Sequence, residues 1–148
     1  MAAKPIPDGY HSMTPNLVVA GAAKLIEFTT RAFGAEPRHR MENPDGTIMH
    51  AEVKIGDSIM MMSDARGQCQ PMPTSLYLYV TDADAVYKRA LEAGATSTMA
   101  PADQFWGDRT AAVRDPTGNV WMIGTHKEDV PPAEMKKRAE AFMLQHAK

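Results

Sequence analysis

Two side chains with acid–base chemistry, His50 and Glu52, stand two residues apart in this sequence. At that spacing on a β-strand, both side chains point to the same face. An imidazole beside a carboxylate can exchange a proton, supply two ligands to a metal ion, or form a plain hydrogen-bonded pair. A metal site needs a third ligand, for which His11 or His126 are candidates. Buried polar groups are usually paired, so the hydrogen-bonded pair is the main interpretation and the metal site is the alternative.

Other chemical motifs are sparse. The sequence has no glycine-rich phosphate loop, no Ser/His/Asp arrangement of recognisable spacing and no Cys/His cluster. Its single cysteine, Cys69, cannot form an internal disulfide, which is typical of a protein from a reducing cytoplasm. We therefore expect a cytoplasmic protein without a bound cofactor.

Composition excludes several classes of partner. The 148 residues are 44% hydrophobic and carry a net charge of −2, with no basic block and no acidic tail. Nothing in this balance indicates binding to nucleic acid or to an anionic membrane surface. The longest apolar run, 59–62, is far too short to span a bilayer, and the first residues lack the apolar core of a signal peptide. We expect neither nucleic acid nor membrane as a partner.

The second half of the sequence repeats the first. The stretch 14–22 aligns with 75–83 at an offset of 61 residues, and each copy continues to a Gly-Ala pair, at 34–35 and 94–95. Further on, 50–53 aligns with 110–113, and 56–61 with 118–123. Self-similarity of this kind predicts one supersecondary unit used twice.

Each half is predicted to contain a strand, a helix and three more strands. In the first half, the apolar spacing predicts a helix over 22–33 ended by Gly34, then strands at 36–42, 47–55 and 58–63. The boundaries we expect for the single domain are module 1 at about 13–63, a linker at 64–74, module 2 at about 75–126 and a C-terminal helix at about 131–147. That helix has one apolar stripe, which must dock on this chain or on a partner.

Alternation along the strands separates two faces. One face is almost wholly apolar and is predicted to pack under the helices. The opposite face mixes polar, aromatic and thioether groups, and is either a solvated surface or a cup for a small molecule. We favour the cup because methionines and tyrosines are poorly explained by solvation. The ligand-binding candidates on this cup face are Asn16, His50, Glu52, Met60, Met62, Tyr77, Tyr79, Trp106, Arg114 and Met122.

Two turns near the end of the second repeat carry a family resemblance. The stretches 104–109 (QFWGDR) and 113–121 (VRDPTGNVW) are similar to those of the vicinal-oxygen-chelate superfamily of glyoxalase I, bleomycin-resistance and extradiol dioxygenase proteins. The stretches 6–10, 50–52 and 125–130 further resemble its PhnB-like branch. The resemblance implies an α+β fold in which two βαβββ modules form a curved, half-open mixed sheet around a central cavity. It also implies a homodimer.

The resemblance also implies where a metal would bind. In the superfamily's enzymes, ligands lie near the start of each module's first strand and on its last strand. Here those positions hold Thr14 and Ser75, then Met60 and Met122. Hydroxyls and thioethers are poor ligands for Mg, Mn, Fe(II) or Ni, which prefer imidazole and carboxylate groups. We therefore predict that the enzyme-type metal site is absent.

Two functions remain open. The first is metal-free binding of a small, flat, partly apolar molecule, with Asn16, His50, Glu52 and Arg114 as polar anchors. The alternative is a lyase, isomerase or dioxygenase of the same superfamily that uses a displaced metal, or His50 and Glu52 as acid and base. The absent ligands favour binding, and the enzyme question stays open.

Overall fold

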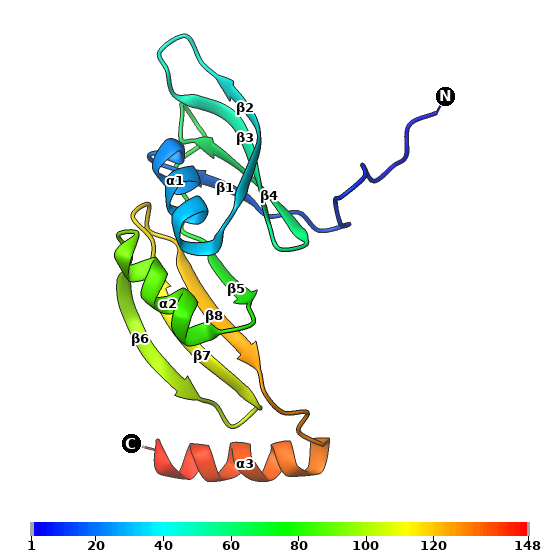
Figure 1. The fold of residues 1–148 in the computed structure, drawn as a ribbon, viewed down its shortest axis with the longest axis vertical. Coiled ribbons are helices and arrows are strands. Elements are labelled where there is room, and N and C mark those ends of the chain that lie inside the picture. Colours follow the sequence, from blue (N-terminus) through cyan, green and yellow to red (C-terminus); the bar gives the residue numbers. More distant parts are fainter. Residues whose placement is uncertain (1, 148) are drawn as a thin grey trace.

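A computed structural model describes residues 2–147 and confirms the α+β class and the two βαβββ modules (Figure 1). Module 1 contains β1 (Asn16–Val19), α1 (Ala22–Phe33), β2 (Glu36–Glu42), β3 (Ile48–Ile55) and β4 (Ser58–Asp64). Module 2 contains β5 (Ser75–Tyr79), α2 (Ala83–Glu92), β6 (Thr96–Asp103), β7 (Asp108–Arg114) and β8 (Val120–His126), and is followed by α3 (Pro132–Gln145). In the described part, no helix is long and apolar enough to cross a membrane.

The modules have the same sheet topology. The strand orders are β1-β4-β3-β2 and β5-β8-β7-β6, and in each sheet the first strand runs parallel to the last while the other pairs are antiparallel. β1 and β5 are edge strands that do not pair with each other. The two sheets therefore stay separate and the barrel is not closed. Figure 1 shows α1 and α2 on one side of the sheets and an open side opposite.

In both modules the end of the last strand holds the start of the helix. The Asp64 carboxylate accepts hydrogen bonds from the N–H groups of Gly21 and Ala22, both at 2.8 Å. At the repeated position 61 residues later, the hydroxyl of Thr125 accepts from the N–H of Ala83 at 2.8 Å. Helix N-termini leave N–H groups without intrahelical partners, so these two side chains satisfy groups that would otherwise need water.

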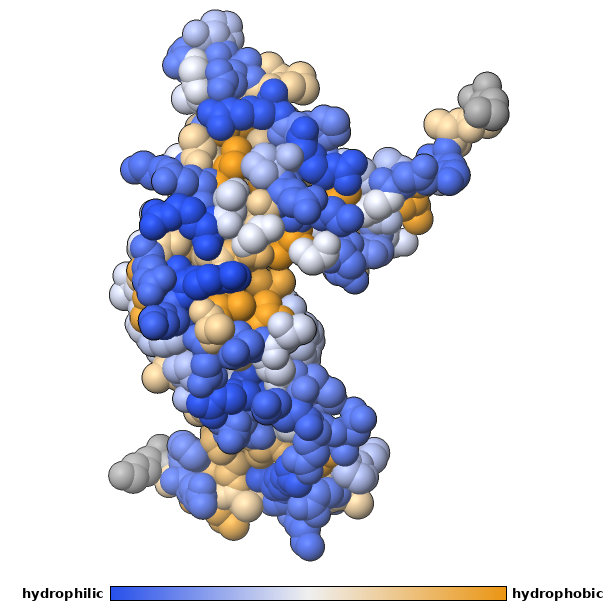
Figure 2. Space-filling model, viewed as in Figure 1, coloured by the Kyte–Doolittle hydropathy of each residue, from blue (hydrophilic) through white to orange (hydrophobic). Residues whose placement is uncertain are grey.

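One hydrophobic core extends through both modules. Its largest buried side chains include Leu17, Leu25 and Phe28 of module 1 and Val113 and Ile123 of module 2. Helices α1 and α2 pack against each other, and the Phe33 ring lies 4.7 Å from that of Trp121, centroid to centroid. Apolar residues accordingly gather in the middle of the molecule, where the modules meet (Figure 2).

A buried carboxylate fixes the tryptophan of this junction. Asp115 is 4% exposed and accepts a hydrogen bond from the Trp121 indole N–H at 2.8 Å. It also accepts from the backbone N–H groups of Thr117 and Asn119, the Thr117 hydroxyl and the Asn119 amide. The Asp-Pro-Thr-Gly-Asn turn is therefore a structural device that holds Trp121 against module 1.

The face of β4 differs from the sequence prediction. The two-residue turn at Gly56 and Asp57 pairs Ile55 with Ser58, so that Glu52 lies opposite Met61. Met60 and Met62 point into the core, at 4% and 0% exposure, and Met61 shares the face of Glu52. Their predicted place on the cup face is therefore wrong. A one-residue error in strand register moves every side chain to the opposite face.

Helix α3 lies beyond module 2 and is peripheral. None of its residues is buried, and it is held by the Arg138–Glu128 ion pair at 2.7 Å and by the ring of Phe142, 5.2 Å from Phe105. Met143 and Leu144 remain 59% and 80% exposed. Its apolar stripe is thus only partly covered within this chain.

We expect Asp115→Ala to lower the free energy of unfolding by about 3 kcal/mol or more, because buried donors that lose their acceptor are costly. Chemical denaturation measures the loss, and near-ultraviolet circular dichroism reports on Trp121. The matched control is Asp45→Ala, which removes similar bonds to Thr47 from an exposed turn and should produce only a small fraction of that loss. Equal losses in the two variants would contradict the role of Asp115.

Candidate functional site

The cup face of module 1 is built around Glu52. This residue is 6% exposed, and its carboxylate accepts hydrogen bonds from His50 at 2.8 Å and from the Tyr10 hydroxyl. Burial raises the pKa of Glu52, but the donors from His50 and Tyr10 lower it further, so the net pKa lies below its ordinary value. The predicted hydrogen-bonded pair of His50 and Glu52 is confirmed, and Glu52 is a carboxylate at neutral pH.

The chain before β1 forms a wall of this half-site. The segment before the first strand lies beside Glu52 and Met61 and borders an open hollow of about 440 Å³, lined by Pro5, Ile6, Pro7, Tyr10, His11, Ser12, Thr14, Glu52 and Met61. Tyr10 was not among the ligand-binding candidates predicted from the sequence. The available signal was its Ile-Pro-Asp-Gly-Tyr stretch, which carries the PhnB-like resemblance.

The cup face of module 2 is built around a second buried carboxylate, Asp108, at 2% exposure. One oxygen accepts hydrogen bonds from the hydroxyls of Tyr77 and Tyr79, at 2.6 and 3.0 Å. The other oxygen lies 2.7 Å from Nδ1 of His126, whose Nε2 lies 2.7 Å from Asp129. We call these five residues the tyrosine cluster.

The charges in the tyrosine cluster follow from these bonds. Burial raises the pKa of Asp108, yet the surrounding donors, Tyr77 first, bring it below its ordinary value. The pKa of His126 is raised by Asp129 and then by Asp108. The pKa of Tyr77 is raised by burial and by Asp108, and that of Tyr79 by its bond to Asp108. These bonds favour an ionised Asp108, a cationic His126 held between two carboxylates, and two neutral phenols.

Tyr77 is positioned by a glycine. A Cβ atom added at Gly124 would lie 2.8 Å from the Tyr77 ring and hydroxyl, closer than real Cβ contacts allow. Tyr77 stands directly opposite Met122 in the β5–β8 pairing, and Gly124 is the next residue along β8 on the same face as Met122. The absence of a side chain at Gly124 therefore allows the phenol to lie flat over β8 and reach Asp108.

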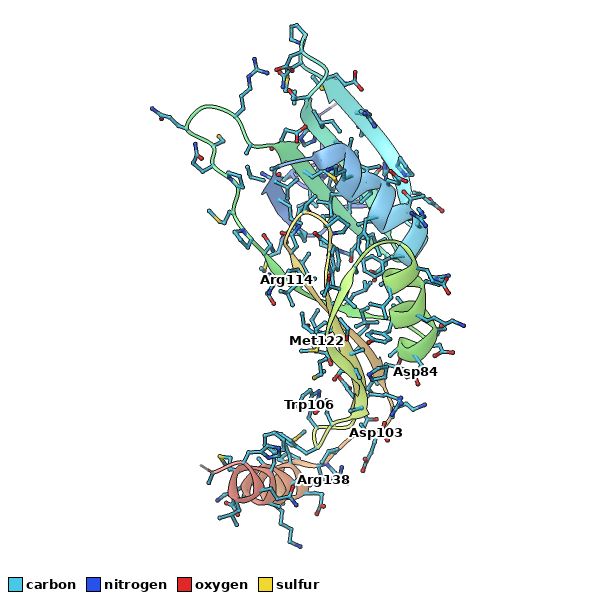
Figure 3. All side chains as sticks on the ribbon, turned by 90° about the vertical axis from the view of Figure 1, so that its left-hand side faces the viewer. Asp84, Asp103, Trp106, Arg114, Met122 and Arg138 are labelled. Carbon is cyan, nitrogen blue, oxygen red and sulfur yellow. The ribbon has the colours of Figure 1, made fainter. Side chains whose placement is uncertain are left out.

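The other predicted site residues spread along module 2. Figure 3 shows Arg114 near module 1, Trp106 toward α3 and Met122 between them. Arg114 is exposed and donates to the Gly118 carbonyl at 3.4 Å, while Trp106 is half-buried. In module 1, Asn16 is exposed on β1. The structure brings His50 to Glu52 and Tyr77 to Tyr79. Asn16 lies in the same cross-strand row as Glu52, with Met61 between them, whereas Arg114 bonds to neither pair.

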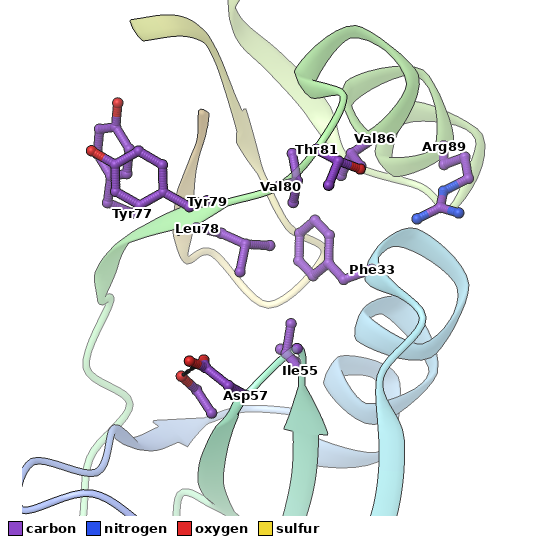
Figure 4. Close-up of a pocket in the computed structure, with 12 residues that line it drawn as sticks. Phe33, Ile55, Asp57, Tyr77, Leu78, Tyr79, Val80, Thr81, Val86 and Arg89 are labelled. Atoms are coloured by element: carbon purple, nitrogen blue, oxygen red, sulfur yellow. Dashed lines mark hydrogen bonds between the residues drawn. The ribbon is translucent and has the colours of Figure 1, made fainter. Parts of the chain in front are cut away.

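Another cavity lies between the modules, along the outer edge of β5 (Figure 4). It measures about 670 Å³ and is lined by Phe33, Ile55, Gly56, Asp57, Ser58, Tyr77, Leu78, Tyr79, Val80, Thr81, Val86 and Arg89. The phenol rings of Tyr77 and Tyr79 point away from Phe33 and Arg89. This cavity therefore adjoins the tyrosine cluster from the side but does not contain His50 or Glu52.

The residues present do not fit the metal site of the superfamily's enzymes. Of the four aligned positions, Met60 faces the core, so the set does not converge. The strand pairs that occupy equivalent places on the cup face are Asn16 with Met61 and Tyr77 with Met122. An amide, a neutral phenol and two thioethers are poor ligands for an oxophilic divalent ion. Within residues 2–147, no three His, Cys, Asp or Glu side chains group as metal ligands.

Sequence reasoning missed most of the tyrosine cluster. Asp108 was not among its ligand-binding candidates. The side chains of Asp108 and Arg109 point to opposite faces: Arg109 binds Asp84 at 2.7 Å on the helix side, while Asp108 lies beneath the tyrosines. The signal was the pairing of β7 with β8, which sets Asp108 opposite His126. Recognising this pairing requires the strand register, which the sequence alone did not supply.

Comparison with known proteins places the chain in a family. The model of the Glyoxalase/Bleomycin resistance protein/Dioxygenase superfamily matches residues 11–123. The chain is also 40% identical over 136 residues to the uncharacterized protein Mb0911c of Mycobacterium bovis, covering 84% of this chain and 90% of that one.

Solved structures share the fold. The TioX protein of Micromonospora sp. ML1 is 26% identical, with a TM-score of 0.67 over 78% of this chain and 98% of its own. A PhnB protein from Bacillus cereus has a TM-score of 0.60 at 16% identity, over 78% and 99% of the two chains. The chain therefore belongs to the glyoxalase, bleomycin resistance protein and dioxygenase superfamily.

Proposed function

We propose that this protein binds a small, flat, partly apolar molecule on its cup face without a metal ion. The observation that carries the proposal is the exposed pair of Tyr77 and Tyr79, at 42% and 61% exposure, with ring centroids 4.9 Å apart. Large aromatic side chains usually bury most of their surface, and an exposed pair is a favourable platform for a planar ligand. Hydrogen bonds to the buried Asp108 hold both rings in place.

Rigidity supports this function. Each ring is fixed at its hydroxyl by the same carboxylate oxygen, so little side-chain entropy remains to be lost on binding. Met61 and Met122 lie on the same face and supply adaptable apolar contacts. His50, Glu52, Asn16 and Arg114 remain the proposed polar anchors. A superfamily that includes both resistance proteins and enzymes does not decide between binding and catalysis, so the argument depends on these residues.

The binding proposal predicts saturable stabilisation without turnover. In a thermal-shift screen of planar aromatic compounds, hits should raise the melting temperature, and calorimetry should give one saturable site. Tyr79→Leu and Trp106→Ala should each weaken binding about fivefold, because an aromatic contact contributes roughly 1 kcal/mol. The matched control is Tyr87→Leu on α2, which lies on the helix side and should leave the affinity within about twofold of the original. Equal weakening in the control would contradict the proposed platform.

Catalysis is the second candidate function. The observation in its favour is Glu52, a buried carboxylate beside His50 at the wall of an open hollow of about 440 Å³. Such a pair can act as acid and base, either by itself or around a displaced metal.

The test of catalysis is turnover of 2-oxo and hemithioacetal compounds. If Glu52 is the base, Glu52→Gln should reduce the rate about 100-fold or more. Elemental analysis then separates the two forms of this candidate, since one equivalent of metal lost in His50→Ala indicates the displaced site. Binding of these compounds with no turnover by the unaltered protein would leave only the binding function.

We further propose that the protein is a homodimer. Helix α3 exposes Met143 and Leu144. In addition, β1 and β5 are edge strands, each paired with a neighbouring strand on one side only. Exposed apolar groups on a peripheral helix favour association with a second copy.

Light scattering at micromolar concentration should give twice the 16.2 kDa chain mass. Met143→Glu should shift the equilibrium toward the monomer, because it places a charge on the exposed apolar stripe. Lys137→Glu, on the polar side of the same helix, is the control and should remain dimeric. A monomeric unaltered protein would contradict the proposal.

A further inference from the structure

The directions of the hydrogen bonds in the tyrosine cluster are fixed by Asp108. An ionised carboxylate can only accept hydrogen bonds. The oxygens of Tyr77 and Tyr79 both lie within 3.0 Å of the same carboxylate oxygen, so each phenol must direct its single proton toward it. Neither hydroxyl has a proton left to donate elsewhere.

The remaining donors of the cluster are committed as well. His126 places one ring nitrogen on Asp108 and the other on Asp129, each at 2.7 Å, so both of its protons are used. The donors of the cluster are thus used in bonds within it, and only acceptor lone pairs face the cup.

Tyr79 presents the acceptor that a ligand from solvent can reach. Its side chain is the more exposed of the pair, at 61%, and its oxygen retains lone pairs that Asp108 does not use. A ligand atom that approaches this oxygen makes a hydrogen bond only if it brings a proton. An ether or carboxylate oxygen in the same place faces lone pairs, and the net negative charge of Asp108, Asp129 and cationic His126 adds repulsion for an anion.

The half-site of module 1 has the same polarity. The carboxylate of Glu52 accepts hydrogen bonds from the Tyr10 hydroxyl and from His50, so both donors of this half-site are directed at a carboxylate. This second, independent cluster presents the oxygen of Tyr10 in the way that the first presents that of Tyr79. The repeat has therefore produced two polar centres that differ in sequence but agree in hydrogen-bonding character.

From this polarity we infer that the ligand of the cup face is a planar aromatic compound that carries an O–H or N–H donor on the edge meeting Tyr79, and that compounds with only acceptors there are rejected. The inference rests on the proposed binding function and adds the chemical class of the ligand. Alcohols, phenols, amines and amides satisfy it, whereas aromatic ethers and carboxylates do not. Discrimination arises because a buried or partly buried acceptor without a donor loses a hydrogen bond that water had supplied.

The test compares two neutral probes of the same ring system, 2-naphthalenemethanol and its methyl ether, by calorimetry. Their lack of charge separates hydrogen bonding from electrostatic attraction. The alcohol should bind about three- to tenfold more tightly than the ether, as expected for one hydrogen bond. In Tyr79→Phe, which keeps the ring and removes the acceptor, this preference should disappear. The control is Tyr87→Phe, which removes a hydroxyl that binds Ser97 on the helix side. In this variant the preference for the alcohol should persist.

Each outcome has a distinct meaning. Equal or tighter binding of the ether to the unaltered protein overturns the inference, and so does a preference for the alcohol that survives in Tyr79→Phe. A third probe, 2-methylnaphthalene, tests the aromatic platform alone, because it has no polar atom. If none of the three naphthalenes binds, the proposed function fails, and the inference fails with it. If 2-methylnaphthalene binds while alcohol and ether do not differ, the function stands and only the inference is overturned.

Discussion

The junction of the two modules depends on the buried carboxylate of Asp115. Its hydrogen bond to Trp121 orients an indole whose ring then packs on Phe33, the last residue of α1. A tryptophan placed in this way closes the core of module 2 and provides the surface on which module 1 rests. Because the two sheets do not pair with each other, this side-chain junction, together with the contact of α1 with α2, sets how the cup faces are arranged.

The repeat conserves the scaffold but not its chemistry. Asp64 and Thr125 occupy equivalent positions and hold equivalent helices, although one is a carboxylate and the other a hydroxyl. His50 and Glu52, in contrast, correspond to Thr110 and Ala112, which lack ionisable groups. In module 2 the buried carboxylate of the cup face is instead Asp108, at the start of β7. The helix N–H groups need hydrogen-bond acceptors in both copies, whereas a polar centre can be built from different positions along a strand.

The fold was largely predictable because its signals are local or repeated. The helix at 22–33 was predicted at its observed bounds, since apolar spacing and a terminal glycine define it within one segment. The pair of His50 and Glu52 was predictable for the same reason. The face of Met60 and Met62 was not, because a two-residue turn decides it, and alternation alone is compatible with either phase. The tyrosine cluster was beyond reach because it joins β5, β7 and β8 with the chain after β8, and these contacts exist only once strand pairing is known.

The close approach of Tyr77 to Gly124 constrains how the site can evolve. Any side chain at position 124 would meet the ring and hydroxyl of Tyr77, so a substitution there requires either that the phenol moves away from Asp108 or that a smaller residue stands at position 77. The loss of Tyr77 in turn removes one of the donors that keep Asp108 ionised and buried. The two positions are therefore expected to covary among homologues, with glycine at 124 wherever an aromatic residue stands at 77. A change of ligand through this part of the cup is therefore expected to involve both positions together.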